Sequence, residues 1–227
     1  MTNNDSAWEA LNQQIIRCTR CPRLIDYIRQ VSKTKVRRFR EESYWGKPVP
    51  GFGDVDAQLF IVGLAPGAHG ANRTGRMFTG DSSGDWLIKA LFESGFANQP
   101  TSQSRHDSLI LHDAFISAPI RCAPPRNRPT AMEVANCSDF LMMEWKLLKN
   151  LKVVLALGRI AFDTCLRYLY PRFQPKPTFQ HGGSYEQEKH PLLMASYHPS
   201  RQNTQTGRLS WEAWKTIFTR ITDILSE

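Results

Sequence analysis

Short apolar runs alternate with amphipathic segments along most of the chain. Three runs are apolar almost throughout, and a weaker fourth resembles them: residues 58–63 (QLFIVG), 153–158 (VVLALG), 192–197 (LLMASY) and 114–118 (AFISA). Continuous apolar runs of about four to eight residues are typical of parallel strands, which are buried on both faces. We therefore expect a central, mostly parallel sheet of four strands.

Between these runs the apolar residues recur at helical spacing. The pattern predicts helices over residues 7–17, 23–31, 85–96, 131–150 and 159–169, and an amphipathic helix over 211–225. Strands that alternate with helices indicate a three-layer α/β/α fold, and we expect residues 1–227 to form one domain. In such folds ligands bind beyond the carboxyl ends of the strands, here the loops 63–83, 119–130 and 198–208.

The charge of the chain points to an anionic partner. Lysine and arginine outnumber acidic residues 29 to 21, which gives a net charge of +8. Nucleic acid is the commonest large anion in the cytosol, although many soluble proteins are mildly basic for no specific reason. The most basic stretch, residues 32–42, is predicted to be solvated surface.

No segment suggests export or membrane insertion. The longest apolar runs are too short to cross a bilayer, and residues 1–10 are polar and acidic rather than a signal peptide. We expect a cytoplasmic, monomeric protein. Its five cysteines are then not expected to form structural disulfides. Four fall into two pairs, Cys18 with Cys21 and Cys122 with Cys137, and Cys165 lies in an apolar helix as a predicted core residue.

Two of the loops carry unusual residues. Residues 63–81 (GLAPGAHGANRTGRMFTGD) follow a strand and precede a helix, so their backbone N–H groups can converge on an anion or a carbonyl oxygen. Neither Gly-x-Gly-x-x-Gly nor a Walker lysine is present, which argues against ordinary nucleotide binding. His198 begins a second loop, residues 198–209 (HPSRQNTQTGRL). A histidine at a strand end suits a donor to a reacting group.

These two segments resemble motif 1 and motif 2 of the uracil-DNA glycosylase superfamily, and most of all family 5, also called type B. The four paired cysteines and residues 121–129 (RCAPPRNRP) agree with that family. The resemblance extends from about residue 18 to residue 218. It implies a DNA repair enzyme that flips a uracil out of the helix and hydrolyses its bond to the sugar.

The resemblance also implies roles for residues of the base pocket. His198 would donate a hydrogen bond to uracil O2, and backbone amides of Gly63, Ala65 and Gly67 would share that role. Phe78 would stack on the flipped base, with core packing as the alternative. Asn127, which carries a donor and an acceptor, would be catalytic by reading a base edge or positioning water, and is otherwise a turn residue.

Motif 1 departs here from families 1 and 4, which carry an acidic or amide residue that handles the attacking water. This chain has Ala68 near that place and no carboxylate from residue 63 to residue 80, an absence that family 5 shares. The nearest carboxylate is Asp81, which the resemblance makes the water activator or sugar stabiliser, while its sequence context also predicts a helix N-cap. A roomier pocket would admit hypoxanthine, xanthine or ethenocytosine as well as uracil.

Other residues are assigned to DNA by the same resemblance. Arg201, Arg208 and Leu209 resemble the segment that enters the minor groove, with Leu209 as a wedge. Arg73 and Arg76 could contact phosphates, and a solvated surface charge is the alternative for every arginine. No motif identifies a protein partner such as a sliding clamp.

The resemblance further implies a [4Fe–4S] cluster bound by four cysteines, Cys18, Cys21, Cys122 and Cys137. The first two lie in an N-terminal iron–sulfur-binding segment of about residues 1–45. Four thiolates would satisfy zinc equally well, so spacing alone leaves that metal open. No lysine in the motifs is placed for a Schiff base, which predicts a monofunctional enzyme. Two rival hypotheses are a lesion-binding module without turnover and a zinc-stabilised RNA-binding protein.

Overall fold

The structure, a computed structural model, describes residues 3–226. A central sheet has the strand order β1-β3-β2-β4-β6-β5. The four middle strands are parallel, as predicted, and the two edge strands pair antiparallel with their neighbours. The strands are β1 (Phe52–Gly53), β2 (Leu59–Val62), β3 (Ala114–Ser117), β4 (Val153–Leu157), β5 (Ser184–Tyr185) and β6 (Leu192–Ser196). We expected four strands, whereas the sheet has six, because the two short edge strands β1 and β5 were not predicted.

Alternate residues of each strand pack into two different cores. Phe60 and Val62 of β2 belong to one hydrophobic cluster, and Leu59 and Ile61 belong to the other. Both faces of the sheet are therefore covered, which explains why the central strands are apolar without alternation.

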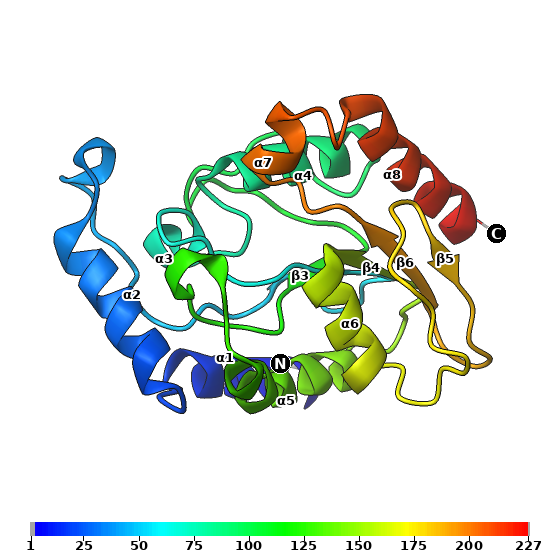
Figure 1. The fold of residues 1–227 in the computed structure, drawn as a ribbon, viewed down its shortest axis with the longest axis horizontal. Coiled ribbons are helices and arrows are strands. Elements are labelled where there is room, and N and C mark those ends of the chain that lie inside the picture. Colours follow the sequence, from blue (N-terminus) through cyan, green and yellow to red (C-terminus); the bar gives the residue numbers. More distant parts are fainter. Residues whose placement is uncertain (1–2, 227) are drawn as a thin grey trace.

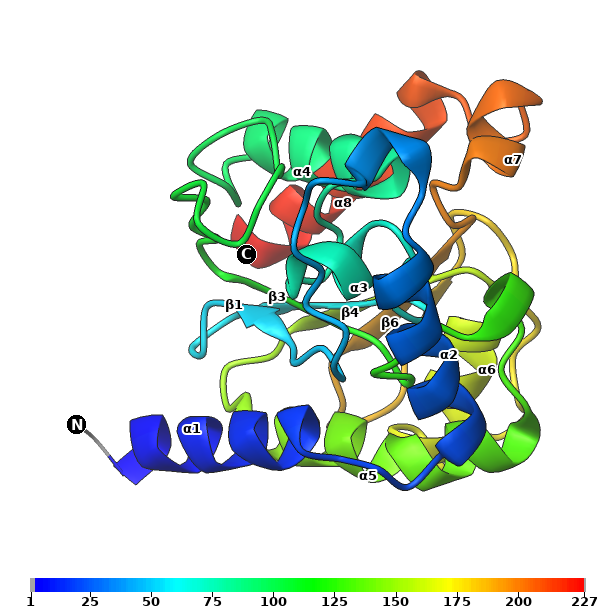
Figure 2. The same cartoon turned by 90° about the vertical axis from the view of Figure 1, so that its left-hand side faces the viewer.

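The helices form the two outer layers. Figure 2 shows α1 and α5 below the sheet and α4 and α8 above it. The first layer consists of α1 (Asn3–Ile16), α2 (Pro22–Thr34), α5 (Ala131–Leu147) and α6 (Arg159–Tyr168), and the second of α4 (Ser82–Glu93) and α8 (Trp211–Ser226). Across the described residues 3–226, no helix combines the length and apolar character that a bilayer span requires.

Short helical turns interrupt the loops around the sheet. They are η1 (Arg37–Phe39), α3 (Ala71–Thr74), η2 (Pro125–Asn127) and α7 (Arg201–Gln205). Figure 1 shows α3 and α7 on the same side of the sheet as α4. Since β2, β4 and β6 are parallel, the loops that follow β2 and β6 leave the same edge of the sheet. The two loops predicted to carry the chemistry therefore meet at this edge.

Candidate active site

Asp81 begins helix α4 and leaves one carboxylate oxygen facing the loop after β2. Its Oδ1 accepts hydrogen bonds from the N–H groups of Ser83 and Gly84, at 3.1 and 3.0 Å. Its Oδ2 lies against Gly67 and Gly70, because a Cβ added there would come within 2.7 and 1.9 Å of that oxygen. The predicted N-cap is confirmed, and both glycines are needed to make room for the second oxygen.

The surroundings of Asp81 make its carboxylate a stronger base than usual. Burial raises the pKa of Asp81, and the two N–H donors of the helix N-terminus offset part of that rise. A carboxylate with a raised pKa accepts a proton from water more readily. The N-cap bonds fix its orientation while Oδ2 stays available.

His198 and Phe78 lie side by side at the same edge. Their ring centroids are 5.8 Å apart, and a Cβ at Gly63 would come within 2.8 Å of the Phe78 ring. Phe78 has a φ of +48°, a strained conformation for an aromatic residue that is often found at functional sites. Burial lowers the pKa of His198 to about 4. The imidazole is therefore neutral at physiological pH and carries one N–H donor.

The backbone amides predicted to bind the base are not equivalent. The N–H of Gly63 donates to the carbonyl of Ser117 at 2.8 Å and continues the ladder between β2 and β3. Because this N–H group is already hydrogen-bonded within the sheet, the predicted role of Gly63 as a donor to the base is corrected. The absence of a side chain at Gly63 instead makes room for the Phe78 ring. Among residues 3–226, the N–H groups of Ala65 and Gly67 have no backbone acceptor. Their predicted role stays a prediction.

Arg73 and Arg76 are structural, which corrects their prediction as phosphate ligands. Arg73 forms an ion pair with Glu42 and donates to the carbonyl of Gly80 at 3.0 Å. Arg76 donates to both carboxylate oxygens of Asp107, at 2.7 and 2.9 Å. Both arginines are buried. Their guanidinium groups hold the loop together from inside and do not face a partner.

Leu209 also differs from its prediction. Its side chain is completely buried in the core that contains α4 and α8, and its N–H donates to the carbonyl of Asn203 at 2.9 Å. It anchors the loop after β6 and is not exposed as a wedge. Arg201 and Arg208 remain exposed, with Arg201 Nε 3.2 Å from the hydroxyl of Ser82.

Asn127 lies at the exposed end of η2 with a φ of +55°. Within the described part of the chain, its amide side chain makes no hydrogen bond. The turn conformation matches the alternative reading of this residue, and the catalytic role stays a prediction.

The four paired cysteines line one small pocket. Cys18 and Cys21 come from the turn between α1 and α2, Cys122 follows β3, and Cys137 lies in α5. Burial raises the pKa of Cys137 to about 11. No cluster of three or more His, Cys, Asp or Glu side chains suited to a single metal ion occurs among residues 3–226. Cys165 is buried in the core, as predicted.

Arg121 lines the same pocket and was missed by the sequence reasoning. Its Nη2 donates to Glu144 at 2.5 Å, whereas its Nε and Nη1 are buried without a partner. Unpaired buried donors are costly, and an anionic metal–thiolate group would satisfy them. The residues therefore fit such a group. The available signal was Glu144, a single acidic residue within the apolar stretch 140–148.

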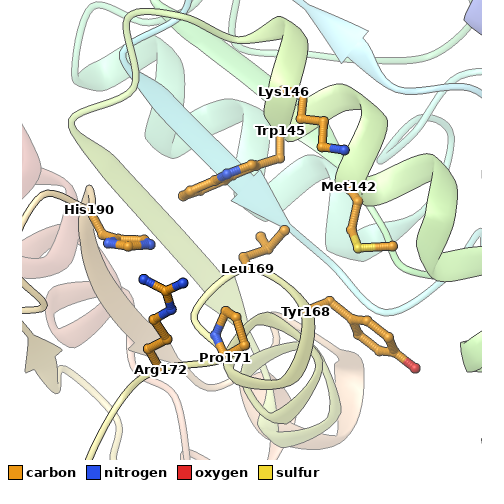
Figure 3. A pocket seen from close by; sticks show the side chains of 8 residues that line it. All are labelled: Met142, Trp145, Lys146, Tyr168, Leu169, Pro171, Arg172 and His190. Carbon is orange, nitrogen blue, oxygen red and sulfur yellow. The ribbon is translucent and has the colours of Figure 1, made fainter.

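A second pocket, of about 350 Å³, lies at the other end of the molecule (Figure 3). Its lining includes the apolar side chains of Trp145 and Leu169 and the basic side chains of Lys146, Arg172 and His190. These residues lie at the ends of α5 and α6 and just before β6, so they adjoin the amino ends of the strands. This pocket is therefore separate from the edge that carries Asp81.

The fold and site together define a parallel α/β protein with a carboxylate, a neutral histidine and an aromatic ring at the carboxyl edge of its sheet. Residues 50–219 match the family model described as the uracil DNA glycosylase superfamily. The chain is 47% identical over 209 residues to a type-5 uracil-DNA glycosylase of Mycobacterium leprae, covering 92% of this chain and 91% of that protein.

Other relatives agree. A type-5 uracil-DNA glycosylase of Thermus thermophilus is 47% identical, over 92% of this chain and 94% of its own. A type-4 uracil-DNA glycosylase of Thermotoga maritima is 29% identical, over 72% of this chain and 68% of its own. The chain therefore belongs to the uracil-DNA glycosylase superfamily, within its type-5 family.

Proposed function

We propose that the protein excises uracil from DNA by hydrolysing the bond between N1 of the base and C1′ of the sugar. The observation that carries this proposal is the placement of Asp81 Oδ2, a neutral His198 and Phe78 at one edge of the sheet. The names of the type-5 relatives support the same substrate.

Each residue has a defined part in the proposed reaction. The flipped base stacks on Phe78, and His198 donates its N–H to O2 as negative charge develops on the departing base. Asp81 accepts a proton from the water that attacks C1′ and faces the positive charge on the sugar. The products are free uracil and an abasic site. No lysine takes part, so the strand is left uncut.

We further propose that hypoxanthine, xanthine and ethenocytosine are substrates. Stacking on an aromatic ring accepts any base, because every base has a π-face. Residues 63–80 contain no carboxylate that would select one base edge by charge.

The four cysteines are proposed to hold a [4Fe–4S] cluster, with zinc as the alternative. The group would supply a structural cross-link between the α1–α2 turn, the segment after β3 and helix α5. The unpaired N–H donors of Arg121 support an anionic occupant of either kind.

Release of free base tests the function. Duplexes with one uracil, hypoxanthine, xanthine or ethenocytosine are incubated with wild type, Asp81→Asn and His198→Ala. Loss of a positioned base or donor should slow uracil release about a hundredfold or more in each variant. Lys149→Ala, on the exposed surface after α5, is the control and keeps the wild-type rate. Binding of lesion DNA by folded wild type without release of any base would instead establish the lesion-binding module.

A further inference from the structure

A second group of cations lies beside the site. Residues 33–40 (KTKVRRFR), here called the basic segment, contain five cations and no carboxylate. Four of the five are exposed, and none forms an ion pair with a carboxylate among residues 3–226. The five are Lys33, Lys35, Arg37, Arg38 and Arg40. Lys35 is half-buried and donates to the carbonyl of Arg40 at 3.0 Å, so the four exposed cations are the ones available to an anion.

The basic segment is fixed to the loop that carries Asp81. The guanidinium carbon of Arg73 lies 3.9 Å from the centroid of the Phe39 ring, and Arg73 also pairs with Glu42 just after the segment. The same guanidinium donates to the carbonyls of His69 and Gly80, at 2.8 and 3.0 Å. The buried Arg73 therefore joins the basic segment to two points of the loop after β2, His69 and Gly80.

The basic segment and α7 also act electrostatically on the same carboxylate. Asp85 lies in the first turn of α4, where burial raises its pKa and the nearby guanidinium groups of Arg38 and Arg201 partly offset that rise. Arg201 also contacts Ser82 in the same turn. In Figure 2 the blue turn that contains η1 lies above α3, on the same side of the sheet as α4. The segment and α7 therefore each place a cation near the first turn of α4, which Asp81 begins.

We propose that the basic segment binds the phosphate backbone of DNA, in addition to Arg201 and Arg208. The inference rests on the proposed function for the identity of the polymer. A run of exposed cations that Arg73 holds next to the proposed base-binding site is complementary in charge to a phosphate backbone. It also gives Arg73 a role as a positioning residue between bound DNA and the active-site loop.

The salt dependence of binding tests this proposal. Each lost phosphate contact reduces the slope of log K against log salt by about 0.9. The triple variant Arg37→Ala/Arg38→Ala/Arg40→Ala should therefore have a slope that is less steep by about 2.7. Between about 50 and 200 mM salt, the affinity of wild type for DNA should then decrease by about 40-fold more than the affinity of the variant. Fluorescence anisotropy is measured on an undamaged duplex without uracil, so the result is independent of excision.

Two matched variants complete the experiment. Lys146→Ala/Lys149→Ala/Arg172→Ala removes the same charge at the other end of the molecule and should keep the wild-type slope. Arg37→Lys/Arg38→Lys/Arg40→Lys keeps the charge and should restore the slope. An unchanged slope in the folded alanine variant, or an equal loss in the distant variant, would overturn the proposal. A less steep slope in the alanine variant, together with no release of base by wild type, would contradict the proposed enzymatic function but still support DNA binding by the basic segment.

Discussion

His198 illustrates how burial of one side chain sets its chemistry. Its pKa falls to about 4 in the folded protein, against about 6.5 in an unfolded chain. A neutral donor suits a reaction in which the departing base becomes anionic, because the proton need not be shed before the hydrogen bond forms. The same shift makes the stability of the protein depend on pH.

We predict that His198 destabilises the protein as the pH falls from about 7.5 to 5. Between the two pKa values the unfolded chain binds a proton that the folded chain does not, so the free energy of unfolding decreases by about 2 kcal/mol at pH 5. His198→Gln removes this contribution, and urea denaturation at both pH values measures it. His106→Gln, at an exposed loop position, is the control. An identical pH dependence in wild type and His198→Gln would contradict the prediction.

The arginines show where residue-level prediction from sequence ends. Arg73 and Arg76 lie in a glycine-rich loop and have the sequence context of surface cations. Their partners are distant in sequence, since Glu42 and Asp107 are each 31 residues away. No local pattern indicates such a pairing, and only the folded chain shows that these guanidinium groups are buried. Phe78 and His198, which were placed by motif, do lie together.

At the scale of elements, the start of α4 combines a structural and a proposed chemical role in Asp81. The two roles can be separated because asparagine caps a helix as well as aspartate, whereas alanine does not. Burial raises the pKa of Asp81, so at neutral pH its charge costs folding free energy. We therefore predict that Asp81→Asn is at least as stable as wild type. Asp81→Ala should be less stable than Asp81→Asn by about 1 kcal/mol, measured by denaturant unfolding.

The rate of base excision by the same two variants separates the catalytic role of Asp81 from its role as a helix cap. Both lack the carboxylate, so both should lose base release although only one loses the cap. Full release by Asp81→Asn would show that Asp81 acts only as a cap.

The central strands were predictable and the edge strands were not. The predicted runs 58–63 and 153–158 contain β2 and β4 with at most one extra residue at either end, because strands buried on both faces are marked by their own composition. The strands β1 and β5 have two residues each and exist only through pairing with β3 and β6. Residues 52–53 and 184–185 accordingly lie outside the four apolar runs from which strands were predicted.

At the scale of the whole molecule, the cysteine pocket joins parts that are far apart in sequence. The α1–α2 turn meets the segment after β3 and the middle of α5. This meeting point lies on the opposite side of the sheet from α4 and α8 (Figure 1). Arg121 and Glu144 continue this connection to Ser117 at the end of β3, through hydrogen bonds of 2.5 Å. A metal–thiolate group at this place would constrain the N-terminal helices against the sheet.

We predict that Cys122→Ser loses its bound metal and much of this constraint. Loss of a covalent cross-link costs about 2–5 kcal/mol, and a chain of this size loses about 2–4 °C per kcal/mol, so Tm should fall by about 10 °C. Iron, sulfide and zinc contents and visible absorbance measure the metal, and calorimetry measures Tm. Backbone hydrogen exchange should rise in α1 and α2, because these helices adjoin the pocket.

Cys165→Ala is the matched control, since Cys165 is buried in the core away from the pocket. It should keep the full metal content and the wild-type exchange of α1 and α2. A brown protein with iron and sulfide in equal amounts supports the [4Fe–4S] cluster, whereas a colourless protein with one zinc per chain identifies the alternative metal. Full metal content in folded Cys122→Ser would show that the four cysteines do not form one ligand set.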